Sequence, residues 1–240
     1  MAGIKVINVS KTLENLFTLN NISLTVKCHE IAVILGPSGC GKSTLLNIIS
    51  GLISPDQGRI ELEGEDWTGR TGRISYMQQK DLLLPSQNIL GNVCIPLLLK
   101  GMRKNQAQEK ARGFLKDFGL DGFETYYPRH LSGGMRQRAA LLRTYLFTSD
   151  IMLMDEPFAR LDAITRRDMH KWLMELWARS RPTVLFVTHD IDEALLLADS
   201  IYVFSPRPGQ IKLHIELQPG SDEKKPEWKQ QILTLLEAEQ

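Results

Sequence analysis

The feature that most limits what this chain can fold into is a glycine-rich segment, residues 36–43, which reads GPSGCGKS. It fits the pattern GxxxxGK followed by Ser or Thr, and it lies between a continuous apolar run at 31–35 and a helix-like run at 44–50. In a strand, loop and helix of this order, glycines let the backbone curl so that its N–H groups and the helix N-terminus face a phosphate. The sequence therefore predicts a phosphate-binding loop at the end of a buried strand.

The lysine and serine that close this segment indicate which phosphate compound binds. Lys42 would place a positive charge between β- and γ-phosphate oxygens, and the Ser43 hydroxyl can ligate Mg²⁺. We therefore expect ATP with Mg²⁺ as the ligand. The residues expected to bind ATP are Gly36, Pro37, Ser38, Gly39, Cys40, Gly41, Lys42, Ser43 and Thr44.

Apolar runs and helix-like segments alternate through much of the remaining chain. The runs at 151–154 and 183–187 are each followed by helix-like sequence, as the buried strands of a parallel sheet are. Other segments alternate between apolar and polar residues, which is typical of half-buried strands. An antiparallel edge made of such strands is expected at residues 4–9, 22–26, 59–63 and 74–77.

The strand pattern lapses between residues 82 and 145, where residues 105–118 have the spacing of an amphipathic helix. The predicted fold class is α/β: a P-loop NTPase core with a mostly parallel sheet, an antiparallel β edge subdomain and an inserted α-helical subdomain. We expect an ATP-binding domain over residues 1–220, with the helical subdomain at about 82–145. Residues 221–240 are expected to form a C-terminal tail or helix.

Two carboxylates, Asp155 and Glu156, follow the apolar run at 151–154. Ligands of open α/β sheets bind beyond the carboxyl ends of the strands, so this pair should lie near the phosphate loop. Asp155 would hold Mg²⁺, directly or through water, and Glu156 would polarise the attacking water. An acidic pair after a strand can also cap a helix, but the phosphate loop upstream favours the catalytic interpretation.

A second candidate anion site precedes the acidic pair, in a run that reads LSGGMRQR and begins at Leu131. Ser132 is a good N-cap, and two glycines leave space in front of the positive end of the following helix. This run matches the signature LSGGxxxR of the ATP-binding-cassette (ABC) family, and the chain resembles that family over nearly its whole length. The matching signature residues are Leu131, Ser132, Gly133, Gly134 and Met135.

The resemblance implies a head-to-tail dimer, in which Ser132 and Gly134 of one subunit contact the γ-phosphate held by Lys42 of the other. It also implies that Gln79 is the glutamine that ligates Mg²⁺ and senses the γ-phosphate, although Gln78 is a rival for this position. The catalytic and metal residues implied by motif and resemblance together are Glu156, His189 and Gln79, with Ser43, Gln79 and Asp155 at the metal and Leu161 and Asp162 in the D-loop.

The segments at 154–158 and 204–211 resemble those of the importer branch that serves nitrate, sulfonate and taurine. This implies transmembrane permease subunits and an extracytoplasmic solute-binding protein as partners. Residues 84–93 would receive the permease, although the same apolar stretch could be ordinary subdomain core. The chain itself would be peripheral on the cytoplasmic face of the membrane, because neither a signal peptide nor a transmembrane helix is expected.

The alternative is a soluble ABC-type ATPase that acts in DNA repair or on ribosomes. The chain has 29 Lys plus Arg against 28 Asp plus Glu, so it has no long-range attraction to nucleic acid, and none is expected as a partner. It also lacks the heptads and basic blocks that would suit the alternative.

Two further expectations concern individual side chains. Cys40 would lie at a helix N-terminus beside Lys42, and both favour the thiolate, so Cys40 should react faster than Cys28 or Cys94. Where the family has an aromatic residue that stacks on adenine, this chain has Leu13. Phe17 could supply the missing ring. Without a ring from Phe17 or a partner subunit, the site should tolerate GTP as well as ATP.

Overall fold

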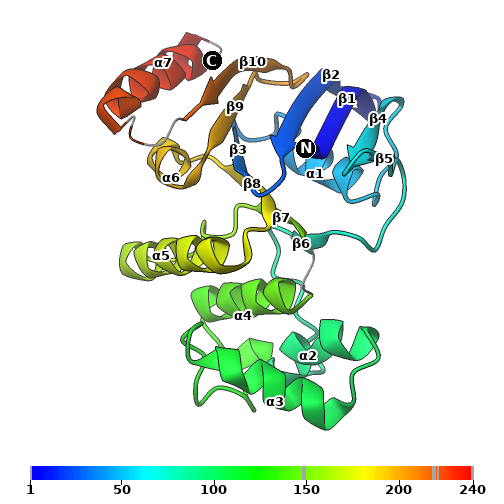
Figure 1. Ribbon diagram of the computed structural model, residues 1–240, viewed down its shortest axis with the longest axis vertical. Coiled ribbons are helices and arrows are strands. Elements are labelled where there is room, and N and C mark those ends of the chain that lie inside the picture. The colour runs from blue at the N-terminus through cyan, green and yellow to red at the C-terminus, as the bar shows by residue number, and fades with distance from the viewer. Residues whose placement is uncertain (1, 148–149, 218–219, 221, 239–240) are drawn as a thin grey trace. The chain divides into compact units, whose positions relative to one another are not determined.

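The computed structural model describes residues 2–147, 150–217, 220 and 222–238. The chain divides into two compact units (Figure 1), the first comprising Met1–Ile74, Asp150–Glu156 and Arg181–Gln240, the second Ser75–Ser149 and Pro157–Ser180. The first unit contains β1 (Ala2–Leu13), β2 (Leu16–Lys27), β3 (Ile31–Leu35), α1 (Lys42–Ile49), β4 (Gln57–Leu62), β5 (Glu65–Asp66), β7 (Ile151–Asp155), β8 (Thr183–Thr188), α6 (Ile191–Leu197), β9 (Ser200–Phe204), β10 (Ile211–Glu216), the 3-10 helix η2 (Asp222–Lys224) and α7 (Lys225–Ala238). The second contains β6 (Ser75–Met77), α2 (Ile89–Leu99), α3 (Lys104–Leu115), the 3-10 helix η1 (Pro128–His130), α4 (Gly133–Leu146) and α5 (Ala163–Ser180).

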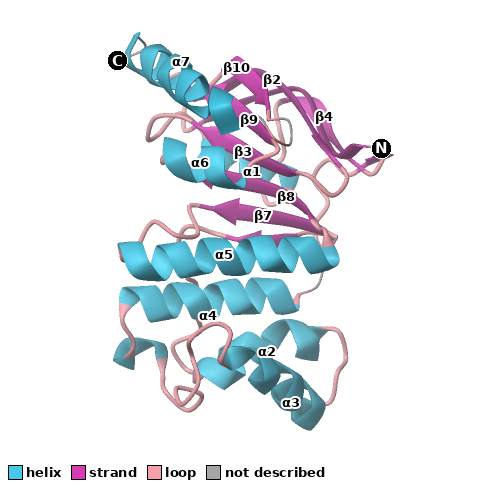
Figure 2. Cartoon of the chain, turned by 60° about the vertical axis from the view of Figure 1, so that its left-hand side comes forward, coloured by secondary structure: helices cyan, strands magenta, loops and turns pink. Residues whose placement is uncertain are grey.

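The main sheet of the first unit is mostly parallel, and its strands from that unit run in the order β10-β9-β3-β8-β7. β9, β3, β8 and β7 are parallel neighbours, and β10 pairs antiparallel with β9. Figure 2 shows these strands in magenta. Every residue of β3, β7, β8 and β9 is buried, which explains why these strands read as continuous apolar runs. The α/β fold class with a mostly parallel sheet is confirmed.

The other sheet of the first unit is antiparallel, in the order β2-β1-β4-β5. β1 and β2 are joined through Glu14 and Asn15, whose φ angles of 47° and 65° are those of a two-residue hairpin turn. β6 is not a strand of this sheet, so the prediction that residues 74–77 join the antiparallel edge is wrong. A segment this short alternates through a single period, which does not indicate the sheet to which it belongs.

The second unit is mainly helical. α2 packs against both α3 and α4, and Figures 1 and 2 both show α4 and α5 side by side. The ring of Phe118 is completely buried, with its centre 4.2 Å from that of Trp172 and 6.3 Å from that of Tyr145. These rings form an aromatic core that joins the end of α3 to α4 and α5.

The helix predicted at 105–118 is present as α3, although it ends at Leu115. Gly119 has a φ of 60°, and the N–H of Leu120 donates to the carbonyl of Leu115 at 2.8 Å. A left-handed glycine with this bond is a common helix ending. The apolar pattern continues to Phe118 because this last turn still faces the core.

The second unit differs in extent from the helical insertion expected at 82–145, because it begins at Ser75 and also includes α5. α7 belongs to the first unit, where Ile232 is completely buried and the Lys229 ammonium pairs with Asp192 of α6 at 2.6 Å. Among the described residues, no helix combines the length and apolar character needed to cross a membrane.

A buried asparagine shapes the start of the helical unit. Asn92 is completely buried, and its side-chain oxygen accepts from the N–H of Leu84 at 2.7 Å. Its side-chain nitrogen lies within hydrogen-bonding distance of the carbonyls of Leu84, Gln87 and Asn88, at 3.0 to 3.1 Å. One side chain therefore bonds to backbone groups of three residues in the segment that leads into α2.

We expect Asn92→Ala to lower the free energy of unfolding by about 2 to 4 kcal/mol, because the four part-buried hydrogen bonds of this side chain would be lost. Chemical denaturation followed by circular dichroism measures this loss. Asn105→Ala, at an exposed position of α3, is the matched control and should change stability by less than about 0.5 kcal/mol. Equal stability of the two variants would contradict the role of Asn92.

Candidate phosphate-binding site

The predicted phosphate loop connects β3 to α1 in the first unit. Gly36, Pro37, Ser38, Gly39, Cys40 and Gly41 form the loop, and Lys42, Ser43 and Thr44 form the first turn of α1. Gly41 caps α1 with a φ of 107° and provides no side-chain hydrogen bond. The N-cap residue therefore supplies no side-chain acceptor to the first N–H groups of α1, and these groups can donate to an anion.

The ammonium group of Lys42 is enclosed by this loop. Its side chain is buried, and Nζ donates to the carbonyl of Gly36 at 2.8 Å and to that of Pro37 at 2.9 Å. A buried charge needs such partners, so the loop carbonyls hold the ammonium in place. The loop thus holds a positive charge close to the N-terminus of α1.

The register of the parallel sheet brings the other predicted residues to the same edge. β8 lies between β3 and β7, with Leu35 opposite Thr188 and Asp155 opposite Val187. The phosphate loop follows Leu35 directly, Glu156 follows Asp155, and His189 follows Thr188. The carboxyl ends of three neighbouring strands therefore supply one site, as sheets of this kind do.

The Asp155 carboxyl group is buried next to the phosphate loop. Burial raises its pKa, and the nearby charge of Glu156 raises it further. A hydrogen bond from the Ser43 side chain and the charge of Lys42 oppose this rise. The hydroxyl of Ser43 and the carboxylate of Asp155 are thus in contact, and both are oxygen groups that suit a hard divalent cation.

Glu156 adopts an uncommon backbone conformation at the end of β7. Its φ is 48°, and its N–H donates to the carbonyl of Val187 at 3.0 Å. Its carboxylate Oε2 lies 3.7 Å from Nδ1 of His189. Left-handed conformations are rare for non-glycine residues and cluster at functional sites. The first unit therefore brings together Lys42, Ser43, Asp155, Glu156 and His189.

The remaining predicted residues lie in the second unit and are described within it. Gln79 is exposed and lies two residues beyond the end of β6. Leu161 is buried, and the carboxylate of Asp162 accepts from the N–H of Thr165 at 3.0 Å near the start of α5. The Ser132 hydroxyl accepts from the N–H of Met135 at 3.2 Å, so the predicted cap of α4 is confirmed.

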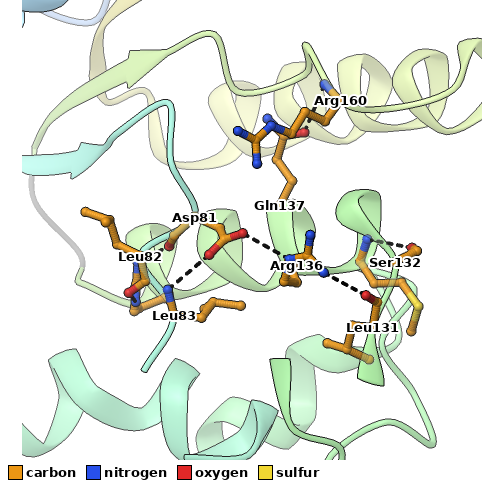
Figure 3. Close-up of polar contacts among 10 residues, drawn as sticks. Asp81, Leu82, Leu83, Leu131, Ser132, Arg136, Gln137 and Arg160 are labelled. Carbon is orange, nitrogen blue, oxygen red and sulfur yellow. Dashed lines mark hydrogen bonds and ion pairs between the residues drawn. The ribbon is translucent and has the colours of Figure 1, made fainter. Parts of the chain in front are cut away.

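A network of polar contacts joins the three predicted segments of this unit (Figure 3). Arg136 donates from Nε to the carboxylate of Asp81 at 3.2 Å and from a terminal nitrogen to the carbonyl of Leu131 at 2.8 Å. The side-chain oxygen of Gln137 accepts from the N–H of Arg160 at 3.2 Å. Sequence reasoning assigned these side chains no role, although Asp81 stands two residues after Gln79 and both other side chains belong to the LSGGMRQR run.

Gly133 and Gly134 form the first turn of α4. A Cβ atom added to Gly134 would lie 3.2 Å from a methyl carbon of Leu161, which is tighter than an ordinary contact. The glycine thus permits the close approach of Leu161 to the start of this helix.

The β1-β2 hairpin separates the two residues considered for base stacking. Leu13 is paired with Leu16, whereas Phe17 is paired with Thr12. Paired residues point to the same face and successive residues to opposite faces, so Leu13 and Phe17 lie on opposite faces of the hairpin. Thr18 and Leu19 both lie close to Gly41 of the phosphate loop, so residues of both alternations approach the loop.

The prediction that Cys40 is the most reactive cysteine is contradicted by its burial. Cys40 is 1% exposed, and burial raises the pKa of its thiol more strongly than the neighbouring Lys42 lowers it. The favourable charge and the helix end are visible in the sequence, whereas the desolvation that favours the neutral thiol depends on the fold.

Comparisons with known proteins identify the family of this chain. Residues 19–159 match the family model described as ABC transporter. The chain is 42% identical to an uncharacterized ABC transporter ATP-binding protein of Methanocaldococcus jannaschii, over 98% of this chain and 92% of that protein. It is 48% identical to a formylaminopyrimidine import ATP-binding protein of Halalkalibacterium halodurans, over 79% of this chain and 74% of that protein. It is 42% identical to a taurine import ATP-binding protein of Pseudomonas syringae pv. tomato, over 84% and 77%.

Solved structures show the same likeness. The dimeric structure of a bacterial ABC transporter cassette matches with a TM-score of 0.83 at 32% identity, over 90% of this chain and 99% of that one. The dimeric structure of a post-hydrolysis state of an ATP-binding cassette bound to ADP and Pi matches with a TM-score of 0.81 at 31% identity, over the same shares. The chain belongs to the ABC transporter family, and it is an ATPase of that family.

The burial of Cys40 generates a test of the phosphate-loop environment. With a maleimide at neutral pH, Cys28, which is half-buried, should be modified before Cys40 and Cys94. Burial raises the pKa of both of the latter thiols, so their labelling should accelerate as the pH rises above neutral. Peptide mapping after timed labelling measures the order, with urea-unfolded protein as the control in which all cysteines react. Labelling of Cys40 as fast as Cys28 would contradict the buried thiol.

Proposed function

We propose that the chain is the ATP-hydrolysing subunit of a membrane importer for a small solute. The observation that carries the proposal is the sheet edge of the first unit, where a buried ammonium, a helix N-terminus capped by glycine and two carboxylates meet. Phosphoryl transfer needs these parts, because its catalysis consists mainly of positioning and charge stabilisation.

In this proposal, different residues of the chain bind the phosphates, activate the water and contact the γ-phosphate. Lys42 and the N–H groups at the start of α1 bind the β- and γ-phosphates. Glu156 orients the attacking water and accepts its proton, and His189 contacts the γ-phosphate. The distance of 3.7 Å between Oε2 of Glu156 and Nδ1 of His189 supports these roles, because the base and the side chain that contacts the phosphate lie beside each other.

The residues present fit a bound Mg²⁺. Burial disfavours the charge of Asp155, and a cation beside the carboxylate would offset that cost. Among the described residues, no group of three or more His, Cys, Asp or Glu could form a metal cage. Ser43 and Asp155 would therefore share the ion with ATP and water, and Gln79 is the further ligand suggested by the family resemblance. When bound, Mg²⁺ would neutralise charge on the phosphate oxygens.

We propose that the ATPase acts as a head-to-tail dimer with a second copy of the chain. In it, Ser132 and Gly134 at the start of α4 face the γ-phosphate held by Lys42 of the other copy. The two glycines in the first turn of α4 and the dimeric structures of relatives support this arrangement. The neighbouring Leu131, Gly133 and Met135 complete the signature, while Leu161 and Asp162 form the D-loop.

The proposed partners beyond the dimer are transmembrane permease subunits and an extracytoplasmic solute-binding protein. Relatives named as taurine and formylaminopyrimidine import proteins support an import role and do not favour the DNA repair or ribosome alternative. Leu82 and Leu84, which follow Gln79, are 50% and 46% exposed. Exposed leucines of this kind would form part of the permease contact and hold the subunit at the cytoplasmic face of the membrane.

The roles of the carboxylate and the lysine can be separated by mutation. Glu156→Gln should retain Mg·ATP binding, lose hydrolysis by about a hundredfold or more, and accumulate as an ATP-bound dimer, because the carboxylate serves the water and not the phosphates. Lys42→Ala, the matched control, should lose ATP binding. Nucleotide titration, phosphate release and size-exclusion chromatography measure the three properties. A Glu156→Gln protein that hydrolyses ATP at the wild-type rate would contradict the assignment of Glu156 as the catalytic base.

The position of Leu13 in the β1-β2 hairpin leads to a prediction about selectivity for the nucleotide base. Stacking on an aromatic ring is worth about 1 to 3 kcal/mol, and Leu13 offers apolar contact without a ring. Leu13→Tyr should therefore tighten ATP binding by about fivefold or more, while the wild type should accept GTP. Phe17→Ala is the control on the opposite face and should leave affinity unchanged. If Phe17→Ala weakens ATP and Leu13→Tyr gains nothing, the base lies on the other face.

A further inference from the structure

The loop between β9 and β10, residues 205–210, packs directly against the phosphate loop. A Cβ atom added to Gly209 would lie 2.3 Å from the carbonyl oxygen of Cys40. One added to Gly36 would lie 2.9 Å from the Cβ of Phe204, the last residue of β9. Real Cβ atoms do not approach other atoms this closely, so glycine is required at both points, and at Gly209 the two backbones are in contact.

The loop 205–210 is held in shape by its own bonds and by β2. The N–H of Ser205 donates to the carbonyl of Gln210 at 2.9 Å, and the buried Ser205 hydroxyl accepts from the N–H of Gln210 at 3.0 Å. The N–H of Gly209 donates to the carbonyl of Thr18 at 2.9 Å, and its carbonyl accepts from Asn20 at 3.0 Å. The loop therefore has a defined conformation that does not depend on the side chain of Arg207.

Arg207 extends from this loop to the phosphate loop. Its Nε donates to the carbonyl of Gly39 at 3.2 Å, and Gly39 has a φ of 78°. The side chain of Arg207 is exposed, and within the described part of the chain it has no other hydrogen bond or ion pair. An arginine that makes a single bond, to a backbone carbonyl of the phosphate loop, has no evident role in holding the fold.

We propose that Arg207 is a positioning residue for the phosphate loop of the proposed nucleotide site. In a trans peptide the C=O and the following N–H point in opposite directions, so a bond to the carbonyl of Gly39 also sets the direction of the Cys40 N–H. That N–H makes a long contact, 3.4 Å, with the carbonyl of Pro37 across the loop. It is therefore a donor that a bound phosphate can take over, and Arg207 keeps it aimed across the loop.

The inference rests on the proposed function, and nucleotide affinity tests it. Titration of the full chain with fluorescent ATP and ADP analogues should show that Arg207→Ala binds both about tenfold more weakly than the wild type, the loss expected for one charge-assisted hydrogen bond. The losses should be equal, because positioning of the loop serves the β-phosphate that both nucleotides carry. The melting temperature without nucleotide should stay unchanged, and Arg207→Lys should lie between the wild type and Arg207→Ala.

Two controls separate the possible failures. Arg59→Ala removes an exposed arginine of the same unit that pairs with Glu61, and it should bind both nucleotides as the wild type does. Lys42→Ala should abolish binding. If Lys42→Ala loses binding while Arg207→Ala stays within twofold of the wild type, the positioning role is overturned and the proposed function stands. A loss confined to ATP, or an equal loss in Arg59→Ala, also overturns it. A wild type that binds neither nucleotide overturns the proposed function itself.

Discussion

The site depends on a buried ammonium group that is solvated by its own loop. An ammonium taken out of water is costly unless other groups replace its hydration shell. Lys42 satisfies this requirement with the carbonyls of Gly36 and Pro37, at 2.8 and 2.9 Å. The loop must therefore curl with its first carbonyls turned inward toward the lysine, which brings the loop around the start of α1. A different curl would leave the charge without partners, so the lysine selects the loop conformation as much as the loop positions the lysine.

Close packing around the loop reinforces this selection. Phe204 stands behind Gly36, Leu19 and Thr18 stand beside Gly41, and Gly209 touches the Cys40 carbonyl. These neighbours come from β2, from the end of β9 and from the loop that follows it, which are distant in sequence. Interiors packed to crystal density allow little adjustment, so the loop is confined from several sides at once. The register of β3, β8 and β7 then determines which carboxylates the confined loop faces.

Secondary structure could be predicted from the sequence where a local residue pattern has a single physical cause. Strands buried on both faces appeared as apolar runs, and the Ser132 cap followed from a short polar side chain before a helix. The burial of a single side chain could not be predicted from the sequence, and the predicted reactivity of Cys40 was therefore wrong. Arg207 was also missed, because its partner is a backbone carbonyl 168 positions away, and such a carbonyl carries no side-chain signal. The placement of β6 failed for a related reason, since strand pairing is a long-range property of the fold.

The two units carry different parts of the proposed chemistry, and each is internally connected. In the first unit, backbone pairing places Asp155 and His189 around the phosphate loop, so these groups cannot move independently of the sheet. In the second, Arg136 joins the segment after Gln79 to Leu131, and Gln137 joins α4 to the segment before the D-loop. These contacts attach the segment after Gln79 and the segment before the D-loop to neighbouring residues of α4, so the second unit, like the first, holds its predicted site segments by specific bonds as well as by packing.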